Sequence, residues 1–317
     1  MSKKVKHYSL AFGICFLLLM LVLTLKNANS VYAFLLGDVQ SLYEQADSLY
    51  RIKKYDDAAK LYSKLVKVDS DKYSQFVIGD MYYQGKTGVV DYEKAIEYFT
   101  RAADNGYADA QNNLGYIYAY GIGADINYSK AKRYLSMAVA QGHSQAQVGL
   151  ASLYRHGWGV TRSYAEAFRL YQRAAAHDNT DAMNNLGYMY TFGYGTATSV
   201  EDAIYWFEKS ASRDNVFALF NLAVFYIEGH GFQKDLSKGA ELLAKAAALN
   251  SPAAQFNLGL MYYLGKGVDK DYSKAKHLFQ QASAQGHNHA LEFLLKVEKK
   301  EMINEPDSIF DFKLKAM

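Results

Sequence analysis

Hydrophobic and small residues recur along the chain at two nested spacings. Within each segment they follow one another at intervals of three to five residues, as in Ala110, Leu114 and Tyr118, which predicts a helix with one buried face. The whole pattern then returns every 36 residues. Its central leucine column consists of Leu114, Leu150, Leu186, Leu222, Leu258 and Leu294. A second apolar stripe follows in each period, so every period is expected to hold two helices, A and B.

One column of small residues directly follows the leucine or its equivalent in helix A. It consists of Gly79, Gly115, Ala151, Gly187, Ala223 and Gly259. Glycine inside a helix costs about 1 kcal/mol relative to alanine, so its recurrence indicates that two helices cross closely at this column.

Glycine pairs separate helix A from helix B, as in Gly121-x-Gly123 and Gly157-x-Gly159. A phosphate loop would need a preceding strand, whereas helices are expected on both sides here. The glycines therefore predict left-handed helix ends and turns. Helix breaks are expected near residues 85–90, 121–127, 157–163, 193–199, 229–235 and 265–271.

The unit Ala-x-x-x-Leu-Gly-x-x-Tyr-x-x-Gly-x-Gly resembles the Sel-one-like repeats, relatives of tetratricopeptide repeats, with six units in residues 72–287. Residues 34–71 resemble one tetratricopeptide unit, with Ala46, Tyr50, Ala58 and Tyr62 in its positions. The resemblance implies an all-α fold, a right-handed α-solenoid of antiparallel helix pairs. Residues 288–317 are expected to form a capping helix and a tail.

The first 33 residues predict a signal peptide or an N-terminal membrane anchor. Lys3, Lys4 and Lys6 precede an uncharged run over residues 8–25. Its length favours an anchor, which would associate the protein with a membrane, while Val31-Tyr32-Ala33 offers a cleavage pattern. In either case the body is expected to be exported, as a periplasmic body on the cytoplasmic membrane or as a periplasmic or secreted protein.

Charge and cysteine content narrow the classes of function. The formal net charge is +3, and the four lysines before residue 34 contribute +4, so the remainder carries −1, which excludes a footprint for nucleic acid. The single cysteine, Cys15, lies in the N-terminal run, so the body has no disulfide and no cysteine nucleophile.

Few residues suggest chemistry. His277, His287 and His289 have no carboxylate or cysteine at a matching spacing, and acids such as Asp91 and Asp271 precede helix B, where aspartate caps a helix. We therefore expect no catalytic residue, no metal and no cofactor, and a protein that is not an enzyme.

The resemblance places a concave groove on helix A, at the residues two before the leucine and two, five and six after it. Aromatic residues are common there and charges are few, which is typical of surfaces that bind proteins. The predicted groove residues are Phe76, Tyr83, Asn112, Tyr116, Tyr120, Asn184, Tyr188, Phe192, Phe220, Phe256 and Tyr263.

These features favour a non-enzymatic scaffold or adaptor in the cell envelope, whose partners are other envelope proteins. Some relatives carry a disulfide in each repeat and are linked to β-lactam binding, and this chain lacks those cysteines. Two alternatives stay open. One is an envelope enzyme or a binder of peptidoglycan or other glycans, and the other is a secreted factor that binds host proteins.

Overall fold

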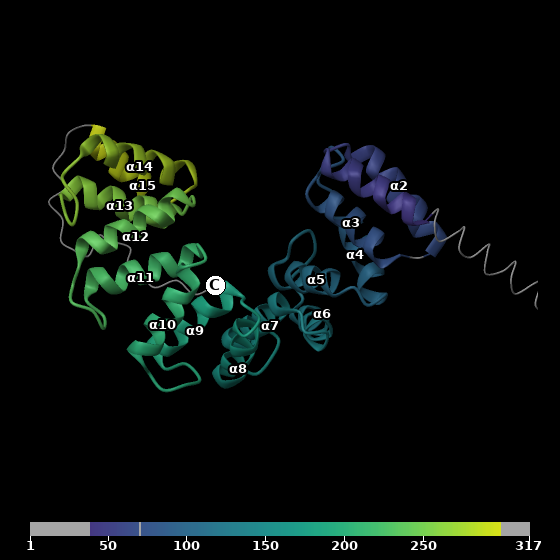
Figure 1. The fold of residues 1–317 in the computed structure, drawn as a ribbon, viewed down its shortest axis with the longest axis horizontal. Helices are drawn as coiled ribbons and strands as arrows, with labels where there is room; N and C mark the ends of the chain where they lie inside the picture. The colour runs from purple at the N-terminus through teal and green to yellow at the C-terminus, as the bar shows by residue number, and fades with distance from the viewer. Residues whose placement is uncertain (1–38, 70, 299–317) are drawn as a thin grey trace, which may run out of the picture. The chain divides into compact units, whose positions relative to one another are not determined.

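The computed structural model describes residues 39–69 and 71–298, and all regular secondary structure in these ranges is helical (Figure 1). A helix over residues 39–51 pairs with α2 (Tyr55–Asp69). The A helices that follow are α3 (Lys72–Tyr83), α5 (Ala108–Tyr120), α7 (Ser144–His156), α9 (Thr180–Phe192), α11 (Val216–Glu228), α13 (Pro252–Leu264) and α15 (Ala290–Glu298). The B helices are α4 (Tyr92–Asp104), α6 (Tyr128–Ala140), α8 (Tyr164–Ala175), α10 (Val200–Ala211), α12 (Leu236–Ala248) and α14 (Tyr272–Ala284).

Consecutive helices contact each other from α2 to α4 and from α6 to α15, and the all-α repeat solenoid that the sequence predicts is confirmed. The chain divides into two compact units, and the boundary falls within α5. The first unit is Met1–Leu114 with Ile122–Ala124, and the second is Gly115–Gly121 with Asp125–Met317. The predicted signal peptide or anchor and the tail after Glu298 lie outside the described residues. Among the residues that are described, no helix is both long and apolar enough to cross a membrane.

Side-chain caps begin the B helices where the sequence places them. Asp91, Asp235 and Asp271 each accept a hydrogen bond from the backbone N–H three residues later. Asn127, Ser163 and Ser199 do the same in the other repeats. Such a cap contributes about 1 kcal/mol to helix stability. The predicted glycine caps also form, because the first glycine of the pair ends α7, α9, α11 and α13 in the left-handed conformation.

The glycine column inside helix A meets a large side chain of helix B. A Cβ atom at Gly187 would lie 2.6 Å from Phe207 of α10, and one at Gly259 would lie 2.8 Å from Phe279 of α14. Both phenylalanines are fully buried. The helices therefore cross at this column, as the recurrence of small residues predicts.

The second glycine of each Gly-x-Gly loop contacts the preceding repeat. Gly159 lies against Tyr128, and Gly195 lies against the backbone of Tyr164; these tyrosines are the first residues of α6 and α8. Both glycines have positive φ, and a Cβ atom at either would collide with the tyrosine. Glycine is therefore required twice over, by conformation and by space.

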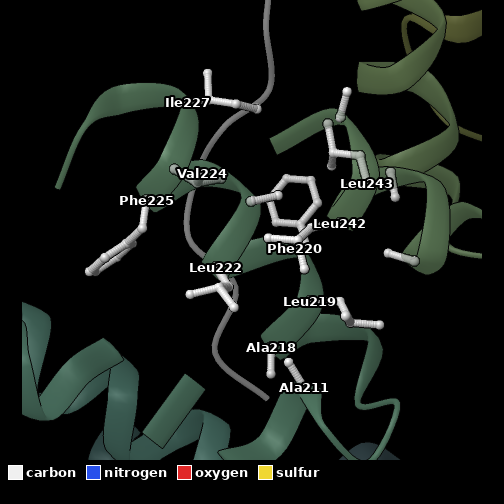
Figure 2. Packing of buried hydrophobic residues seen from close by; sticks show 14 of the residues in the cluster. Ala211, Ala218, Leu219, Phe220, Leu222, Val224, Phe225, Ile227, Leu242 and Leu243 are labelled. Carbon is white, nitrogen blue, oxygen red and sulfur yellow. The ribbon is translucent and has the colours of Figure 1, made fainter. Parts of the chain in front are cut away.

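Each unit has its own hydrophobic core. In the first, Tyr62 and Leu65 of α2 pack with Ile78 and Met81 of α3. In the second, residues of α10, α11 and α12 form a continuous cluster, in which Leu242 and Leu243 meet the side chains of α11 (Figure 2). Phe225 of α11 also contacts Phe207 of α10, with ring centroids 5.4 Å apart. Burying such a ring stabilises the fold by about 2–3 kcal/mol.

Candidate functional site

The predicted groove residues divide into three groups by exposure. Tyr120 and Phe192 are exposed, by 52% and 45%. Four others are half-buried, namely Phe76, Tyr83, Tyr116 and Tyr188. The remaining five are buried, namely Asn112, Asn184, Phe220, Phe256 and Tyr263. Only the first two groups present a substantial ring surface to solvent.

In the first unit, the half-buried rings pack against their own repeat. The ring centroid of Phe76 lies 4.9 Å from that of Tyr107 and 5.6 Å from that of Phe99. Tyr83 makes an edge contact with Tyr92 at 5.4 Å. Burial, together with Asp109, raises the pKa of Tyr107 to about 12, so its hydroxyl stays protonated. These rings contribute to packing within the repeat.

In the second unit, five side chains form what we call the first aromatic cluster. Tyr116 and Tyr120 stack with ring centroids 6.0 Å apart and planes at 9°. Tyr120 meets the edge of Trp158, which is stacked with Tyr128 at 5.5 Å and with His156 at 4.4 Å. Aromatic pairs of this kind contribute about 0.5–1.5 kcal/mol each beyond burial, so the cluster holds the exposed Tyr120 ring in place.

Four more rings, from the repeats 144–179 and 180–215, form the second aromatic cluster. Tyr188 and Phe192 lie 4.7 Å apart, and Phe192 stacks with Tyr194 at 5.7 Å. Tyr194 stacks in turn on Tyr164 at 4.6 Å. The guanidinium of Arg155 lies 5.9 Å from the centroid of the Tyr188 ring, although Arg155 is only 9% exposed. An almost buried cation thus borders an exposed aromatic surface.

Hydrogen bonds between repeats connect Tyr116 of α5 with the N-terminal ends of α7, α9 and α11. The Tyr116 hydroxyl donates to the Gln145 carbonyl oxygen at 3.4 Å and accepts from its side-chain amide at 3.3 Å. The same amide donates to Asp181 at 3.3 Å, and the Asn215 amide donates to Asp181 at 2.9 Å. The Asn179 amide donates to Gln145 at 2.8 Å. We call these five residues the polar ladder, and they fix the spacing of three successive repeats.

Burial and charge shift the pKa of three side chains in the two clusters, Tyr116, Tyr188 and His156. Burial raises the pKa of Tyr116 and of Tyr188, so both hydroxyls stay protonated at neutral pH. Burial and then the positive charge of Arg155 lower the pKa of His156, so its imidazole stays neutral where it stacks on Trp158. Two arginines border the second cluster, because Arg155 lies beside Tyr188 and the Arg162 guanidinium lies 5.6 Å from the centroid of the Tyr164 ring.

Sequence reasoning missed four cluster members: Tyr128, Trp158, Tyr164 and Tyr194. Trp158 and Tyr194 occupy the middle position of a Gly-x-Gly loop, and Tyr128 and Tyr164 are the first residues of B helices. The signal was present, because the middle loop position is aromatic only at Trp158 and Tyr194 among the five Gly-x-Gly loops.

The histidines considered for a metal have other contacts. His287 stacks on Phe256 with ring centroids 4.4 Å apart, and His289 lies 6.3 Å from the same ring. Over residues 39–69 and 71–298, no group of three or more His, Cys, Asp or Glu side chains is placed to hold a metal ion.

Comparison with known proteins identifies the repeat. The family model described as "Sel1 repeat" matches six adjoining segments of 36 residues each. These are residues 72–107, 108–143, 144–179, 180–215, 216–251 and 252–287. No curated protein sequence matches the chain.

Two solved structures show the same architecture. A Sel1 repeat protein from Oxalobacter formigenes is 28% identical with a TM-score of 0.68, and the match covers 82% of this chain and 76% of that one. A protective antigen present in uropathogenic Escherichia coli strains, displaying an SLR fold, is 29% identical with a TM-score of 0.61. That match covers 78% of this chain and 53% of the antigen, so the chain spans about half of the antigen's length.

Proposed function

The chain belongs to the Sel1 repeat family, whose members generally mediate protein–protein interaction, and from this premise we propose that it is a non-enzymatic adaptor in the cell envelope. It binds a partner protein through the first and second aromatic clusters. The observation that carries this proposal is the exposure of Tyr120 and Phe192, the last residues of α5 and α9, two A helices separated by α7.

The two exposed rings have the properties of interface anchors. Both are held by ring contacts, so little conformational entropy is lost when a partner covers them. Aromatic anchors of this kind often cost 2 kcal/mol or more when truncated. Arg155 adds a cation beside the second cluster, and arginine is also common at interface centres.

A protein partner fits these clusters better than a glycan does. Sugars bind to open ring faces, whereas Trp158 is stacked with both Tyr128 and His156, and Tyr120 is stacked with Tyr116. The ring edges and the hydroxyl of Tyr120 are left for contact, and a protein surface can use both.

The envelope location is supported by the sequence of the first 33 residues. Lysines before an uncharged run place the N-terminus on the cytoplasmic side, so the repeats would lie on the opposite side of the membrane. A periplasm-active reporter fused after residue 40 tests this assignment. Activity of the reporter only in the cytoplasm would contradict it.

Photo-crosslinking in the native host tests the interaction surface. A photoreactive phenylalanine replaces Tyr120 in one variant and Phe192 in another, and crosslinked proteins are identified by mass spectrometry. We expect both positions to capture the same partner. Different proteins at the two positions, or none at either, would contradict a shared surface.

Two exposed tyrosines outside the clusters supply the matched control. Tyr205 of α10 and Tyr272 of α14 are 53% and 51% exposed, similar to Tyr120. We expect Tyr120→Ser with Phe192→Ser to abolish partner capture, whereas Tyr205→Ser with Tyr272→Ser leaves it unchanged. Circular dichroism of both double variants checks that the helices are retained. An equal loss of partner capture in both double variants would mean that the substitutions act through the fold and not through the clusters.

A further inference from the structure

A pocket of about 370 Å³ lies between the paired helices α13 and α14. Leu258, Tyr262 and Leu278 form its apolar floor, since they are the less exposed residues of the lining. The exposed rim is polar and comes from α14, with Ser273, Lys274 and His277. The volume lies at the lower end of the range for ligand-binding pockets, so the pocket has room for one aromatic ring.

The repeats 72–107 and 108–143 show what fills the same position elsewhere in the chain. Tyr98 of α4 stacks on Tyr82 of α3 with ring centroids 6.0 Å apart and planes at 20°. Tyr134 of α6 stacks on Tyr118 of α5 at 6.0 Å with planes at 8°. Leu278 holds this position in α14, at the same place of the 36-residue period. Leucine is smaller than tyrosine and has no ring, so the space that a tyrosine ring fills in those repeats belongs to the pocket here.

Tyr262 lies in the column of tyrosines that follow the leucine position of helix A by four residues. In the preceding repeat, Phe232 of the loop stacks on Tyr226 with ring centroids 4.1 Å apart and planes at 6°. Val268 stands where that phenylalanine would be in the repeat of Tyr262. Within the part of the chain that the structure describes, only Tyr154 and Tyr262 of this column make no ring contact. A ring face that most repeats cover from within is therefore open at Tyr262.

Positive charge surrounds the open ring. The Lys274 Nζ atom lies 5.0 Å from the centroid of the Tyr262 ring, and the lysine side chain is 60% exposed. Its ion pair with Asp271 is long, at 3.5 Å, and an ammonium group has three N–H donors, so Lys274 has capacity for a second acceptor. Residues 264–278 contain four lysines and two aspartates, which gives a net charge of +2. The other open tyrosine of the column has Glu166 at the position of Lys274, so it lacks this charge.

We propose that this pocket binds an aromatic side chain of a partner protein, in a segment where acidic residues flank the ring. The ring stacks on Tyr262 between Leu258 and Leu278, as the helix B tyrosines do in the first two Sel1 repeats, and a flanking carboxylate pairs with Lys274. The site goes beyond the proposed function, because none of its lining residues belongs to either aromatic cluster. Failure of this proposal leaves the proposed function standing.

Titration of the full-length chain with three blocked peptides tests the chemistry of the pocket. The probe is acetyl-Asp-Phe-Asp-amide, and the controls are acetyl-Asp-Ala-Asp-amide, which lacks the ring, and acetyl-Asn-Phe-Asn-amide, which lacks the charge. Methyl NMR of labelled leucine follows the signals of Leu258 and Leu278. We expect the probe to shift both signals, the alanine peptide to bind at least tenfold more weakly, and the asparagine peptide to bind severalfold more weakly. Unshifted signals with the probe, or a control that binds as tightly as the probe, would overturn the proposal.

A substitution that closes the pocket from within locates the binding. Leu278→Tyr introduces the residue that holds this position as Tyr98 and Tyr134, so the new ring should stack on Tyr262 and fill the pocket. We expect the shift of the Leu258 signal with the probe to be lost, while the midpoint of thermal denaturation is retained. An unchanged affinity of the probe for Leu278→Tyr would overturn the assignment to this pocket.

Two exposed lysines give a matched pair that does not depend on tolerance of the larger side chain. Lys274→Gln is expected to weaken binding of acetyl-Asp-Phe-Asp-amide severalfold. Lys238→Gln changes the equivalent lysine of the preceding repeat, where Phe232 covers Tyr226, and is expected to leave binding unchanged. Equal affinities of the two lysine variants would overturn the role of Lys274, whatever the stability of Leu278→Tyr.

Discussion

Within the second unit, α9 differs from α11 and α13 at equivalent positions of the repeat. Two residues after the leucine, Tyr188 of α9 is half-buried, whereas Val224 and Leu260 are fully buried members of core clusters. The last residue of the helix behaves differently, because it is exposed in α9, as Phe192, and in α11, as Glu228. The residue at the end of helix A therefore determines whether the exposed surface is aromatic, as at Phe192, or charged, as at Glu228.

The largest expected effect is a difference in the stability that the protein loses when one of two phenylalanines in the predicted groove is truncated. Phe256 is fully buried among Phe279, Phe293 and His287, so Phe256→Ala should lower the free energy of unfolding by about 3–5 kcal/mol. Phe192→Ala should lower the free energy of unfolding by about 1 kcal/mol, because Phe192 is 45% exposed. Denaturation midpoints of the two variants measure the difference. Similar losses of stability in the two variants would contradict the division of the groove residues into buried and exposed groups.

The loop that carries Tyr194 offers the next largest effect. Gly195→Ala forces a side chain into positive φ, at about 1–2 kcal/mol, and against the backbone of Tyr164, at about 1–3 kcal/mol more. Gly142→Ala is the matched control, since Gly142 also has positive φ but has no atom within 4 Å of the added Cβ. The midpoint of thermal denaturation should be clearly lower for Gly195→Ala than for Gly142→Ala. Equal midpoints would mean that the contact between repeats is not tight.

The polar ladder should contribute a smaller amount. Gln145→Ala removes hydrogen bonds to Tyr116, Asn179 and Asp181, and we expect the free energy of unfolding to fall by about 1–2 kcal/mol. Gln172→Ala, at an exposed position of α8, should change it by less than about 0.5 kcal/mol. Chemical denaturation measures the free energy of unfolding of both variants. Equal values for Gln145→Ala and Gln172→Ala would show that the polar ladder adds no stability.

The smallest expected effect is a pH dependence at His156. Burial and Arg155 lower its pKa in the folded state below the ordinary value of 6.5, so the unfolded chain takes up the proton first as pH falls. The stability that the neutral imidazole contributes is therefore present above about pH 6.5 and is lost as pH falls below it through the folded-state pKa. Titration by NMR should give a pKa below 6.5 for His156. In His156→Phe, stability should fall less between pH 7.5 and pH 5.5.

The fold could be predicted almost completely because its determinants are local and repeated. Asp91, Asp271 and Ser251 cap helices where a short side chain precedes each apolar stripe, and Pro252 takes the first helical position. Asp178, Asp214 and Asn250 adopt the positive φ that their residue types tolerate. Each of these features depends on a few neighbouring residues, which one sequence contains in full.

The candidate site could be predicted only in part because exposure depends on neighbours in space. The repeat pattern assigns Tyr120 and Phe220 to one groove, yet Tyr120 is 52% exposed and Phe220 is buried in the core around α11. Trp158 lies inside the turn that Gly157 and Gly159 predict, and its stacking on Tyr128 depends on the close fit of two repeats at Gly159. The spacing of residues within one repeat cannot predict this contact, because it forms between two repeats.

The contact between each loop glycine and the preceding helix has a consequence for how such a chain lengthens. In each of the five Gly-x-Gly loops, the second glycine packs against the first residue of the B helix in the preceding repeat, as Gly195 packs against Tyr164. The two sides of this contact recur every 36 residues, so duplication or deletion of one whole period joins surfaces that fit each other. A duplication or deletion of any other length leaves the surfaces mismatched. Gene duplication can therefore extend this protein in steps of one cassette without inventing a new interface.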